Sequence, residues 1–296
     1  TIWMEGIGLI GLGANAKAAS IAGDLVVQNA RVRAIGEDAG GFRPISEKDL
    51  FDCEYWSLEQ AKLGKGASPK FQGKIVMITG GSGTIGFAIA EAFSKLGAQT
   101  ILVDKDEIAL KESVTKLGVG HKYFPIDVTH SDAANQALLA AINNFGGLDI
   151  LISNAGAAHA GPMLGISNEE LRNAFELNFF SHYSFSTEAA KIMKDQNRGG
   201  QILFNISKQA VNPGKNFGAY GLPKATTFFL MRQLALELGS DGIRVNGINA
   251  DRIRSGLLTD EFISSRAKSR GVSESEYMAG NLLNKEVTAE HVADAF

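Results

Sequence analysis

The sequence predicts an α/β protein built on a doubly wound parallel sheet. From Phe71 onward, short apolar segments rich in β-branched residues alternate with longer segments of helical periodicity. This alternation is typical of parallel strands whose connecting helices cover both faces of the sheet. The first of six expected strands runs directly into a glycine-rich turn, and ligands of such sheets bind beyond the carboxyl ends of the strands. Residues 1–70 lack this alternation and are predicted to form an N-terminal α/β extension.

The composition is that of an ordinary globular protein. The chain has 296 residues, of which 45% are hydrophobic and 21% charged, and its net charge of −3 argues against nucleic acid as a partner. Cys53 is the single cysteine, which excludes a disulfide within the chain and fits a reducing, cytoplasmic location. The apolar opening Thr1–Gly13 carries Glu5 and has no cationic start, so neither a signal peptide nor a membrane span is expected.

The extension contains a glycine pattern that is not interpreted as a nucleotide site. Gly6, Gly8 and Gly11 form G-x-G-x-x-G, but they lie inside the apolar run Met4–Gly13. A nucleotide-binding turn follows a strand, so these glycines are expected to permit close packing within one strand. No titratable cluster here has metal-ligand spacing, and no metal site is predicted. A helix is predicted over Asn15–Ile35, and Ser46 is predicted to cap a turn. Ser57 and Gln60 form a capping box that starts a helix over Leu58–Leu63, and a linker follows at Gly64–Pro69.

The stretch Lys74–Gly86 predicts a dinucleotide site. A strand over Ile75–Thr79 leads through the glycine-rich turn into a helix over Ile85–Leu96. The N-terminus of a helix offers unpaired N–H groups to an anion, and glycines let the backbone approach a pyrophosphate. Asp104 follows the strand Thr100–Val103, about 20 residues on, where an acidic residue accepts hydrogen bonds from a ribose 2′-OH. The candidate cofactor-binding residues here are Gly80, Ser82, Gly83, Thr84, Ile85, Gly86 and Asp104.

Beyond Asp104 the chain keeps the same alternation. Helices are predicted over Asp106–Leu117, Ser131–Phe145, Asn168–Lys194 and Ala219–Leu238, the third opened by the capping pair Ser167 and Glu170. One strand is predicted to end near Ile126, and others to run over Leu148–Ser153, Gln201–Ile206 and Ile243–Asn249, with short helical segments up to Phe296.

Three residues are candidates for catalysis. Tyr220 and Lys224 are four residues apart on a predicted helix, so both project from one face. A tyrosine, whose reference pKa is about 10, acts as a base at neutral pH when a nearby cation favours its phenolate, and Lys224 supplies that cation. Ser207 follows a strand and is placed to hold a substrate oxygen while Tyr220 takes its proton. A structural tyrosine beside a surface lysine is the alternative, but the glycine turn and Asp104 favour catalysis.

These motifs resemble the short-chain dehydrogenase/reductase family. The matching segments within residues 71–296 are TGGSGTIG, Asp104, Asp127-Val128, the turn SNAG at Ser153–Gly156, Asn178, Ser207 and YGLPK at Tyr220–Lys224. The resemblance implies a Rossmann-like fold and a nicotinamide cofactor. It implies that Asn178 holds a water which links Lys224 to solvent, and that Tyr220 and Lys224 contact the nicotinamide end. Further cofactor contacts implied by the family are Asp127, Val128, Asn154, Ala155 and Gly156.

The sequence departs from the family pattern at three places. Thr84 replaces the middle glycine of the turn and puts a β-branched side chain where backbone usually faces pyrophosphate, with Gly83 as a partial substitute. Ser153 replaces the first asparagine of the family's NNAG turn. Ala250-Asp251 replaces the proline-glycine after the sixth strand, which predicts a different loop beside the nicotinamide. The chain is also expected to end before the family's last strand and so to leave an exposed sheet edge.

Two segments resemble a narrower group. FDCEYWSLEQAKLGK at Phe51–Lys65 and INADRIRSG at Ile248–Gly256 are similar to bifunctional proteins in which a class II, metal-dependent sugar-phosphate aldolase precedes the dehydrogenase, as in rhamnulose-1-phosphate aldolase/lactaldehyde or alcohol dehydrogenases. Residues 1–70 would then be the tail of the aldolase domain, with its metal-binding histidines upstream of Thr1. Arg252 and Arg254 are interpreted as solvated surface arginines, with an anionic substrate as the alternative.

The functional hypothesis is an NAD-dependent enzyme that interconverts a small hydroxy compound, such as a sugar alcohol, a hydroxyaldehyde or a lactaldehyde-like molecule, and its carbonyl form. Asp104 favours NAD because a carboxylate repels the 2′-phosphate of NADP, and Lys105 is expected to point to the other face of the strand. A catalytically silent nucleotide-binding or scaffold domain of a bifunctional aldolase is the alternative. Surplus apolar residues on the two long helices, such as Phe228–Met231, predict a homodimer or homotetramer.

Overall fold

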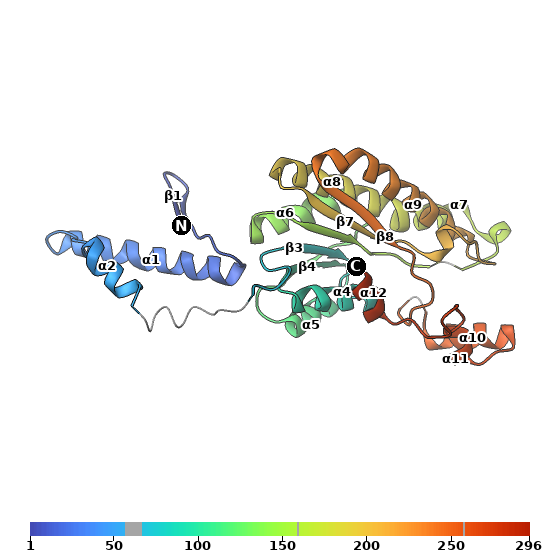
Figure 1. The fold of residues 1–296 in the computed structure, drawn as a ribbon. Coiled ribbons are helices and arrows are strands. Elements are labelled where there is room, and N and C mark those ends of the chain that lie inside the picture. The colour runs from blue at the N-terminus through green and yellow to red at the C-terminus, as the bar shows by residue number, and fades with distance from the viewer. Residues whose placement is uncertain (57–66, 159, 257) are drawn as a thin grey trace. The chain divides into compact units, whose positions relative to one another are not determined.

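The computed structural model describes residues 1–56, 67–158, 160–256 and 258–296. The chain consists of two compact units, Thr1–Gly73 and Lys74–Phe296 (Figure 1). The division predicted after residue 70 lies three residues before this boundary. The helix predicted over Leu58–Leu63, its capping box and residues 64–66 of the predicted linker lie outside the described residues.

The first unit begins with a hairpin rather than the single strand predicted over Met4–Gly13. Strands β1 (Ile2–Met4) and β2 (Gly8–Ile10) pair antiparallel. Gly6 in the turn between them and Gly8 at the start of β2 have φ angles of 72° and 126°, a conformation that glycine adopts without steric cost. The glycines therefore permit a turn within the apolar run.

Two helices complete the first unit. Helix α1 (Ala16–Asp38) starts where the sequence predicted, with Asn15 as its capping residue, and α2 (Glu47–Glu54) is capped by the side chain of Ser46. Gly11 provides the close packing expected of a glycine, because a Cβ there would collide with the backbone of α1. No described residue of either helix is buried, so the described part of this unit forms no core.

The second unit contains the predicted parallel sheet, which has six strands in its described part. The strands are β3 (Ile75–Thr79), β4 (Gln99–Asp104), β5 (Lys122–Pro125), β6 (Ile150–Ser153), β7 (Gly200–Asn205) and β8 (Ile243–Ile248). Their spatial order is β5-β4-β3-β6-β7-β8, and every neighbouring pair is parallel. The chain therefore winds outward in both directions from β3 and β6. This confirms the doubly wound fold, whose ligands bind where the strand order reverses.

Helices cover both faces of this sheet (Figure 1). One group contains α4 (Thr84–Lys95), α5 (Glu107–Leu117) and the last helix, α12 (Ala289–Ala295), which packs against α4. The other group contains α6 (Ala133–Phe145), α8 (Ser181–Gln196) and α9 (Gly218–Leu238). Two further helices, α10 (Asp260–Arg270) and α11 (Glu274–Met278), pack on each other after β8. None of the described helices is long and apolar enough to cross a membrane.

The centre of the sheet is its most buried part. Val76, Met77 and Ile78 of β3 have no exposed surface, because α-helices lie against both faces of this strand. Burying an aliphatic side chain of this size contributes about 1.5–3 kcal/mol, which makes β3 a rigid base for the turn that follows it.

The long helix predicted over Asn168–Lys194 is interrupted. Helix α7 (Asn168–Phe175) carries the predicted capping box of Ser167 and Glu170 and then passes into a π-helical turn, η2 (Glu176–Phe180), before α8 begins. A π-helical turn accommodates one extra residue and is frequent at functional sites. Asn178 lies at the middle of this turn.

Candidate active site

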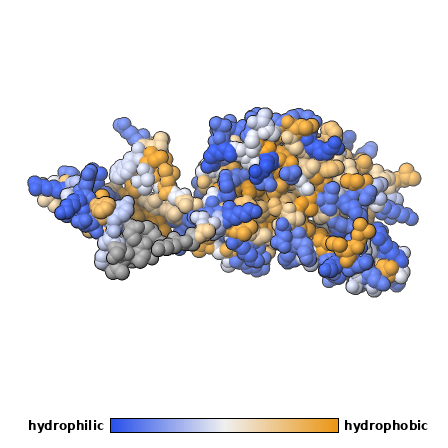
Figure 2. Space-filling model, viewed as in Figure 1, coloured by the Kyte–Doolittle hydropathy of each residue, from blue (hydrophilic) through white to orange (hydrophobic). Residues whose placement is uncertain are grey.

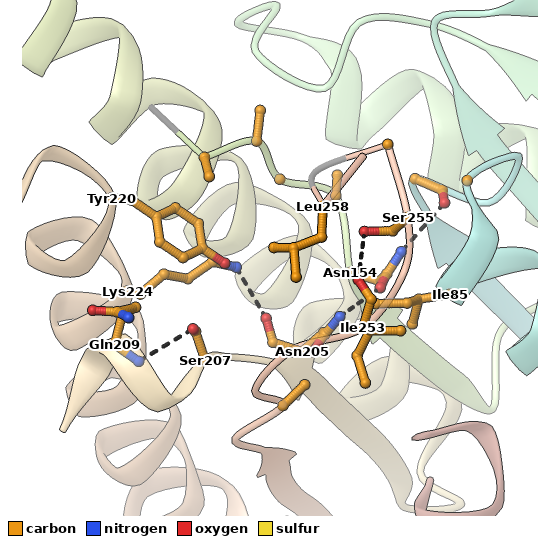
Figure 3. Close-up of a pocket in the computed structure, with 18 of the residues that line it drawn as sticks. Ile85, Asn154, Asn205, Ser207, Gln209, Tyr220, Lys224, Ile253, Ser255 and Leu258 are labelled. Atoms are coloured by element: carbon orange, nitrogen blue, oxygen red, sulfur yellow. Dashed lines mark hydrogen bonds between the residues drawn. The ribbon is translucent and has the colours of Figure 1, made fainter. Parts of the chain in front are cut away.

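A cleft of about 700 Å³ lies at the carboxyl ends of the strands in the second unit. Its walls come from the turn after β3, the ends of β4, β6 and β7, the start of α9 and the segment after β8. Figure 3 shows Ser207, Tyr220 and Lys224 on one side of this cleft and Ile85 and Asn154 on the other. The cleft therefore joins the predicted dinucleotide turn to the predicted catalytic residues.

The turn after β3 has the geometry of an anion site. Gly80 has a φ of 64°, and a Cβ on Gly86 would collide with the Gly80 carbonyl, so both glycines are required by the tight turn. Gly83 is the capping position of α4 and offers no side chain to the N–H groups of the first helical turn. Those groups are therefore open to a phosphate, and Thr84, the departure from the family pattern, is the exposed first residue of the helix.

Asp104 is tied to this turn. Its Oδ2 accepts hydrogen bonds from the Ser82 hydroxyl at 2.7 Å and the Ser82 N–H at 3.3 Å, while Oδ1 accepts from the Lys105 N–H at 2.8 Å. The expectation that Lys105 faces away is wrong, because β4 ends at Asp104 and strand alternation ends with it. Asp104 and Lys105 both line the cleft, so a residue of each charge lies at this part of it.

The other predicted cofactor residues line the same cleft. Val128 is buried and Asp127 is exposed, and hydrogen bonds from Thr129 hold the pKa of Asp127 below its usual value. Asn154 fixes the turn after β6, because its amide donates to the Thr79 and Gly80 carbonyls at 3.0 and 3.2 Å. The neighbouring residues Ala155 and Gly156 also line the cleft, together with the predicted Gly80, Gly83, Thr84, Ile85 and Gly86.

Ser207, Tyr220 and Lys224 meet at the inner end of the cleft. Burial raises the pKa of the Tyr220 phenol, and a hydrogen bond with the Ser207 hydroxyl acts in the opposite direction. Lys224 Nζ lies 5.8 Å from the centre of the Tyr220 ring. The lysine is 2% exposed, and burial lowers its pKa to about 7. The charged and neutral forms of Lys224 are therefore closer in free energy at neutral pH than those of an exposed lysine.

Asn178 is placed by the π-helical turn η2. Its amide donates to the carbonyls of Ala157 and Ala174 at 3.0 and 3.1 Å, and its own carbonyl accepts from the Thr227 hydroxyl of α9 at 2.7 Å. Asn178 Oδ1 is buried and has no hydrogen-bond partner among the described residues. A Cβ on Gly156 would lie 2.9 Å from this oxygen and 3.5 Å from Lys224 Nζ. The missing side chain of Gly156 thus leaves space between the two polar atoms.

Several residues at the site carry no recognised sequence signal. The Asn205 side chain donates to Asn154 Oδ1 at 2.9 Å, and its backbone carbonyl accepts from Lys224 Nζ at 3.0 Å (Figure 3). Thr79 Oγ1 accepts from the backbone N–H groups of Asn154 and Ala155 at 2.9 and 3.1 Å. A polar residue ending a buried strand was the available signal for both Thr79 and Asn205. His182 shows no such signal, since it follows an aromatic run inside a helix.

The segment after β8 differs from its prediction. Arg252 is not a solvated arginine: its side chain is 14% exposed, lies 4.9 Å over the Tyr277 ring and donates to the carbonyls of Tyr277 and Gly280. Arg254 forms ion pairs with Asp260 at 2.6 Å and Glu286 at 2.7 Å. These contacts tie the loop to the segments around α10 and α11, so both arginines contribute to building this side of the cleft.

Asp251 also has a structural partner. Its carboxylate lies 2.7 Å from Lys208 Nζ, and the Lys208 N–H donates to the Ala250 carbonyl at 3.0 Å. The two residues that replace proline-glycine in this sequence thus fasten the loop after β8 to the short helix that follows Ser207. Both residues line the cleft.

Comparisons with known proteins agree with this architecture. The short chain dehydrogenase family model matches residues 74–263, and the model of the second domain of class II aldolases matches residues 1–63. The uncharacterized oxidoreductase YuxG of Bacillus subtilis (strain 168) is 31% identical over 99% of this chain. This chain spans only 44% of YuxG. The 7alpha-hydroxysteroid dehydrogenase of Escherichia coli (strain K12) is 34% identical over 60% of this chain and 71% of its own.

Solved structures show the same fold. L-sorbose reductase from Gluconobacter frateurii, complexed with NADPH and L-sorbose, superposes with a TM-score of 0.70 at 28% identity, covering 78% of this chain and 90% of its own. The 3-ketoacyl-(acyl-carrier-protein) reductase from Brucella melitensis, complexed with NADH, superposes with a TM-score of 0.66 at 24% identity, covering 75% and 88%.

Proposed function

Because this chain belongs to the short-chain dehydrogenase family, we propose that it is an NAD-dependent oxidoreductase acting on a small hydroxy compound. The substrate class is a sugar alcohol, a hydroxyaldehyde or a lactaldehyde-like molecule, converted to its carbonyl form or back. The observation that carries the proposal is the convergence of Ser207, Tyr220 and Lys224 at the inner end of a cleft that starts at a glycine turn. A silent scaffold domain would have no need to keep these three groups together.

The residues around the cleft fit a dinucleotide. The open N–H groups of α4 suit a pyrophosphate, because Gly83 at the capping position has no side chain to bond them. Asp104 suits an adenosine ribose, since a carboxylate with two oxygens has acceptor sites left after its bonds to Ser82 and Lys105. A bound nicotinamide dinucleotide supplies the hydride acceptor or donor of the reaction.

Proton transfer is assigned to this chain's own side chains. In the oxidation direction Tyr220 Oη takes the proton of the substrate hydroxyl, while the Ser207 hydroxyl holds the same oxygen by a hydrogen bond. Lys224, as an ammonium ion, favours the Tyr220 phenolate by its charge. The proton then leaves by way of Lys224 and the space between its Nζ and Asn178 Oδ1. In the reduction direction the same atoms pass the proton the other way.

NAD is proposed over NADP because of Asp104. A 2′-phosphate would meet this carboxylate a few ångströms away, and like charges that are partly desolvated repel by several kcal/mol on an order-of-magnitude basis. The bonds from Ser82 also keep the carboxylate in place, so it cannot swing aside without losing them. Lys105 lines the same end of the cleft and reduces the repulsion, so we expect a preference rather than exclusion of NADP.

The domain organisation is proposed from the N-terminal match. Residues 1–70 would be the end of a class II aldolase domain, and residues 71–296 the dehydrogenase domain of a bifunctional protein located in the cytoplasm. The match of residues 1–63 to the aldolase family supports this, as does YuxG, which matches both units. The absence of buried residues in the described helices α1 and α2 also fits a segment that completes its core with other parts of a longer protein.

An oligomer is proposed from exposed apolar side chains on two helices. Phe180 and Tyr183 are 45% and 47% exposed at the start of α8, and Phe229 and Leu236 are 65% and 82% exposed on α9. Hydrophobic residues also gather on the visible surface of this unit in Figure 2. Apolar residues on the outer faces of two neighbouring helices fit burial against a second copy of the chain.

Turnover tests the proposed function against the scaffold alternative. The purified chain would be incubated with NAD and a panel of short hydroxyaldehydes and sugar alcohols, and formation of NADH followed by absorbance. Turnover that disappears in a Tyr220→Phe variant supports the enzyme. NAD binding without turnover of any compound, in either direction, would favour the scaffold.

A further inference from the structure

Three buried polar side chains lie in contact behind the candidate active site. Ser153 and His182 are each 1% exposed, and Lys224 is 2% exposed. Ser153 Oγ lies 2.6 Å from His182 Nδ1, and His182 Nε2 lies 3.5 Å from Lys224 Nζ. His182 is on α8, one helical turn after Asn178. The imidazole thus connects the end of β6 to the lysine that faces Tyr220.

The contacts of the ring define its tautomer. When Lys224 is an ammonium ion it can only donate, so the facing His182 Nε2 is then the acceptor. In that form the ring proton lies on Nδ1 and is donated to Ser153 Oγ. Burial, and then the charge of Lys224, lowers the pKa of His182 well below its usual value, against a hydrogen bond with the Ala155 backbone that raises it, so the ring stays neutral at physiological pH.

The surroundings of Lys224 Nζ account for its three N–H donors. One donates to the Asn205 carbonyl at 3.0 Å, and a second points toward His182 Nε2. The third is left for the space beside Gly156, where Asn178 Oδ1 also points. Among the described residues, the titratable side chains that face Nζ are His182 from α8 and Tyr220 from α9, while β7 and η2 present the neutral Asn205 and Asn178.

We propose that His182, oriented by Ser153, is a positioning residue that holds the ammonium group of Lys224 beside Tyr220. The inference rests on the proposed function, because it concerns the proton transfer assigned to Tyr220. It also gives Ser153 a role: this serine, which departs from the family's asparagine, fixes the ring that contacts the lysine. A histidine that merely filled the core would need a hydrogen-bond partner, but not one placed against the catalytic cation.

The tautomer of His182 can be measured without any substrate. Long-range ¹H–¹⁵N spectra of the full chain distinguish protonated Nδ1 from protonated Nε2, and a His182→Gln variant assigns the signal. We expect an Nδ1–H tautomer whose signals do not change between about pH 5.5 and 8, because the pKa of the buried ring is lowered. An Nε2–H tautomer, or a His182 signal that titrates within this range, would overturn the inference.

Kinetics of three variants test the effect on Lys224. His182→Leu removes the acceptor that stabilises the Lys224 ammonium, whose charge favours the Tyr220 phenolate. The pH profile of kcat for oxidation should therefore shift upward by roughly half to one unit, because one hydrogen bond of ordinary strength is lost. Ser153→Ala should shift it in the same direction by less, because the ring remains but is no longer held. His182→Gln, which restores an acceptor oxygen, should recover part of the shift.

Phe185→Leu is the control for packing. Phe185 is 1% exposed on the same helix and belongs to the hydrophobic core, so this change should lower Tm and leave the pH profile where it was. If His182→Leu and Ser153→Ala behave like Phe185→Leu, the proposed role of His182 is wrong. If His182→Leu does not fold, Ser153→Ala and His182→Gln decide the question. If the unmodified protein shows no turnover, the proposed function is refuted. The measured tautomer of His182 then decides the inference about this residue.

Discussion

Asn205 at the end of β7 donates its side-chain amide to Asn154 Oδ1 at 2.9 Å and offers its backbone carbonyl to Lys224 Nζ at 3.0 Å. One residue thus fixes both the turn beside the cleft and the lysine proposed to act in catalysis. Replacing Asn205 with leucine would leave Asn154 Oδ1 without this donor in a partly buried site.

We expect Asn205→Leu to lower the free energy of unfolding by about 1–3 kcal/mol, the usual cost of an unsatisfied buried polar group. Urea denaturation measures this directly. Asn144→Leu is the matched control, because the Asn144 amide is exposed and bonds only to the Ala140 carbonyl of its own helix. Equal effects of the two changes would contradict the role given to Asn205.

Tyr220→Phe removes the ionisable oxygen and little else. The fold and NAD binding should survive, while turnover falls by about 10²–10⁴-fold, the range of general acid–base catalysis. Steady-state kinetics and NADH binding by fluorescence test the two halves of this expectation. Near-normal turnover of Tyr220→Phe on a confirmed substrate would refute the assignment.

Ser207→Ala should move the pH optimum of oxidation upward, because the hydrogen bond that counteracts the raised Tyr220 pKa is lost.

The Asp104→Ser change, combined with Lys105→Arg, should convert the cofactor preference. The carboxylate that repels a 2′-phosphate disappears, and an arginine able to bind phosphate at two points takes the neighbouring position. We expect the ratio of the NADP and NAD dissociation constants to change by at least about tenfold toward NADP, equivalent to about 1.4 kcal/mol. Calorimetric titration of both cofactors measures the ratio, and tighter NADP binding by the unmodified protein would disprove the NAD proposal.

Lys224 should make stability depend on pH. Its pKa is about 7 in the fold, against a reference value of about 10.4 in the unfolded chain, so between these values the unfolded state binds more protons. The free energy of unfolding contributed by this group therefore rises with pH from about 7 to about 10 and is lowest below pH 7. Lys224→Met removes the buried charge and should stabilise the protein at pH 6, by an amount that diminishes toward pH 10.

Urea denaturation at pH 6 and pH 9.5 tests this dependence. Lys191→Met is the control, because Lys191 is exposed and pairs only at the surface with Glu188. Its effect should be small at both pH values. A Lys224→Met effect of the same size at both pH values would mean that the buried lysine keeps an ordinary pKa.

Charged residues on the outer face of α9 should separate the subunits. Phe229→Asp together with Leu236→Lys places charges at the two most exposed apolar positions of this helix. Light scattering should then show a smaller species than the unmodified protein, with an unchanged circular dichroism spectrum. Ile108→Lys is the control, since Ile108 is 74% exposed on α5, away from the proposed contact. A monomeric unmodified protein at micromolar concentration would dispose of the oligomer.

The parallel sheet was predictable because its signals are local. The strand Ile75–Thr79 is entirely buried and consists of apolar or β-branched residues, and Asp106 caps α5, the helix that the periodicity places after Thr100–Val103. The hairpin of the first unit was missed because a three-residue strand is too short to show an alternating pattern. Ser207, Tyr220 and Lys224 could be named because four-residue spacing and strand ends bring them to one edge.

The contacts of His182 could not be predicted in the same way. The ring contacts Ser153 and Lys224, which are 29 and 42 residues away in the sequence, and it lies just after a π-helical turn that nothing local in the sequence marks. Likewise, Arg252 belongs to a polar loop by composition, and only the packing of Tyr277 beneath its guanidinium group buries it.

The π-helical turn at Glu176–Phe180 restricts how this part of the chain can vary in length. Deleting one residue within it would restore a regular α-helix and rotate Asn178 by roughly 100° relative to α8, since each residue advances an α-helix by that angle. The Asn178 carbonyl would lose the Thr227 hydroxyl of α9, and its amide would leave the Ala157 carbonyl. A change in length by a single residue, which a surface loop would tolerate, is therefore expected to displace Asn178 from both contacts and to disrupt the proposed proton path.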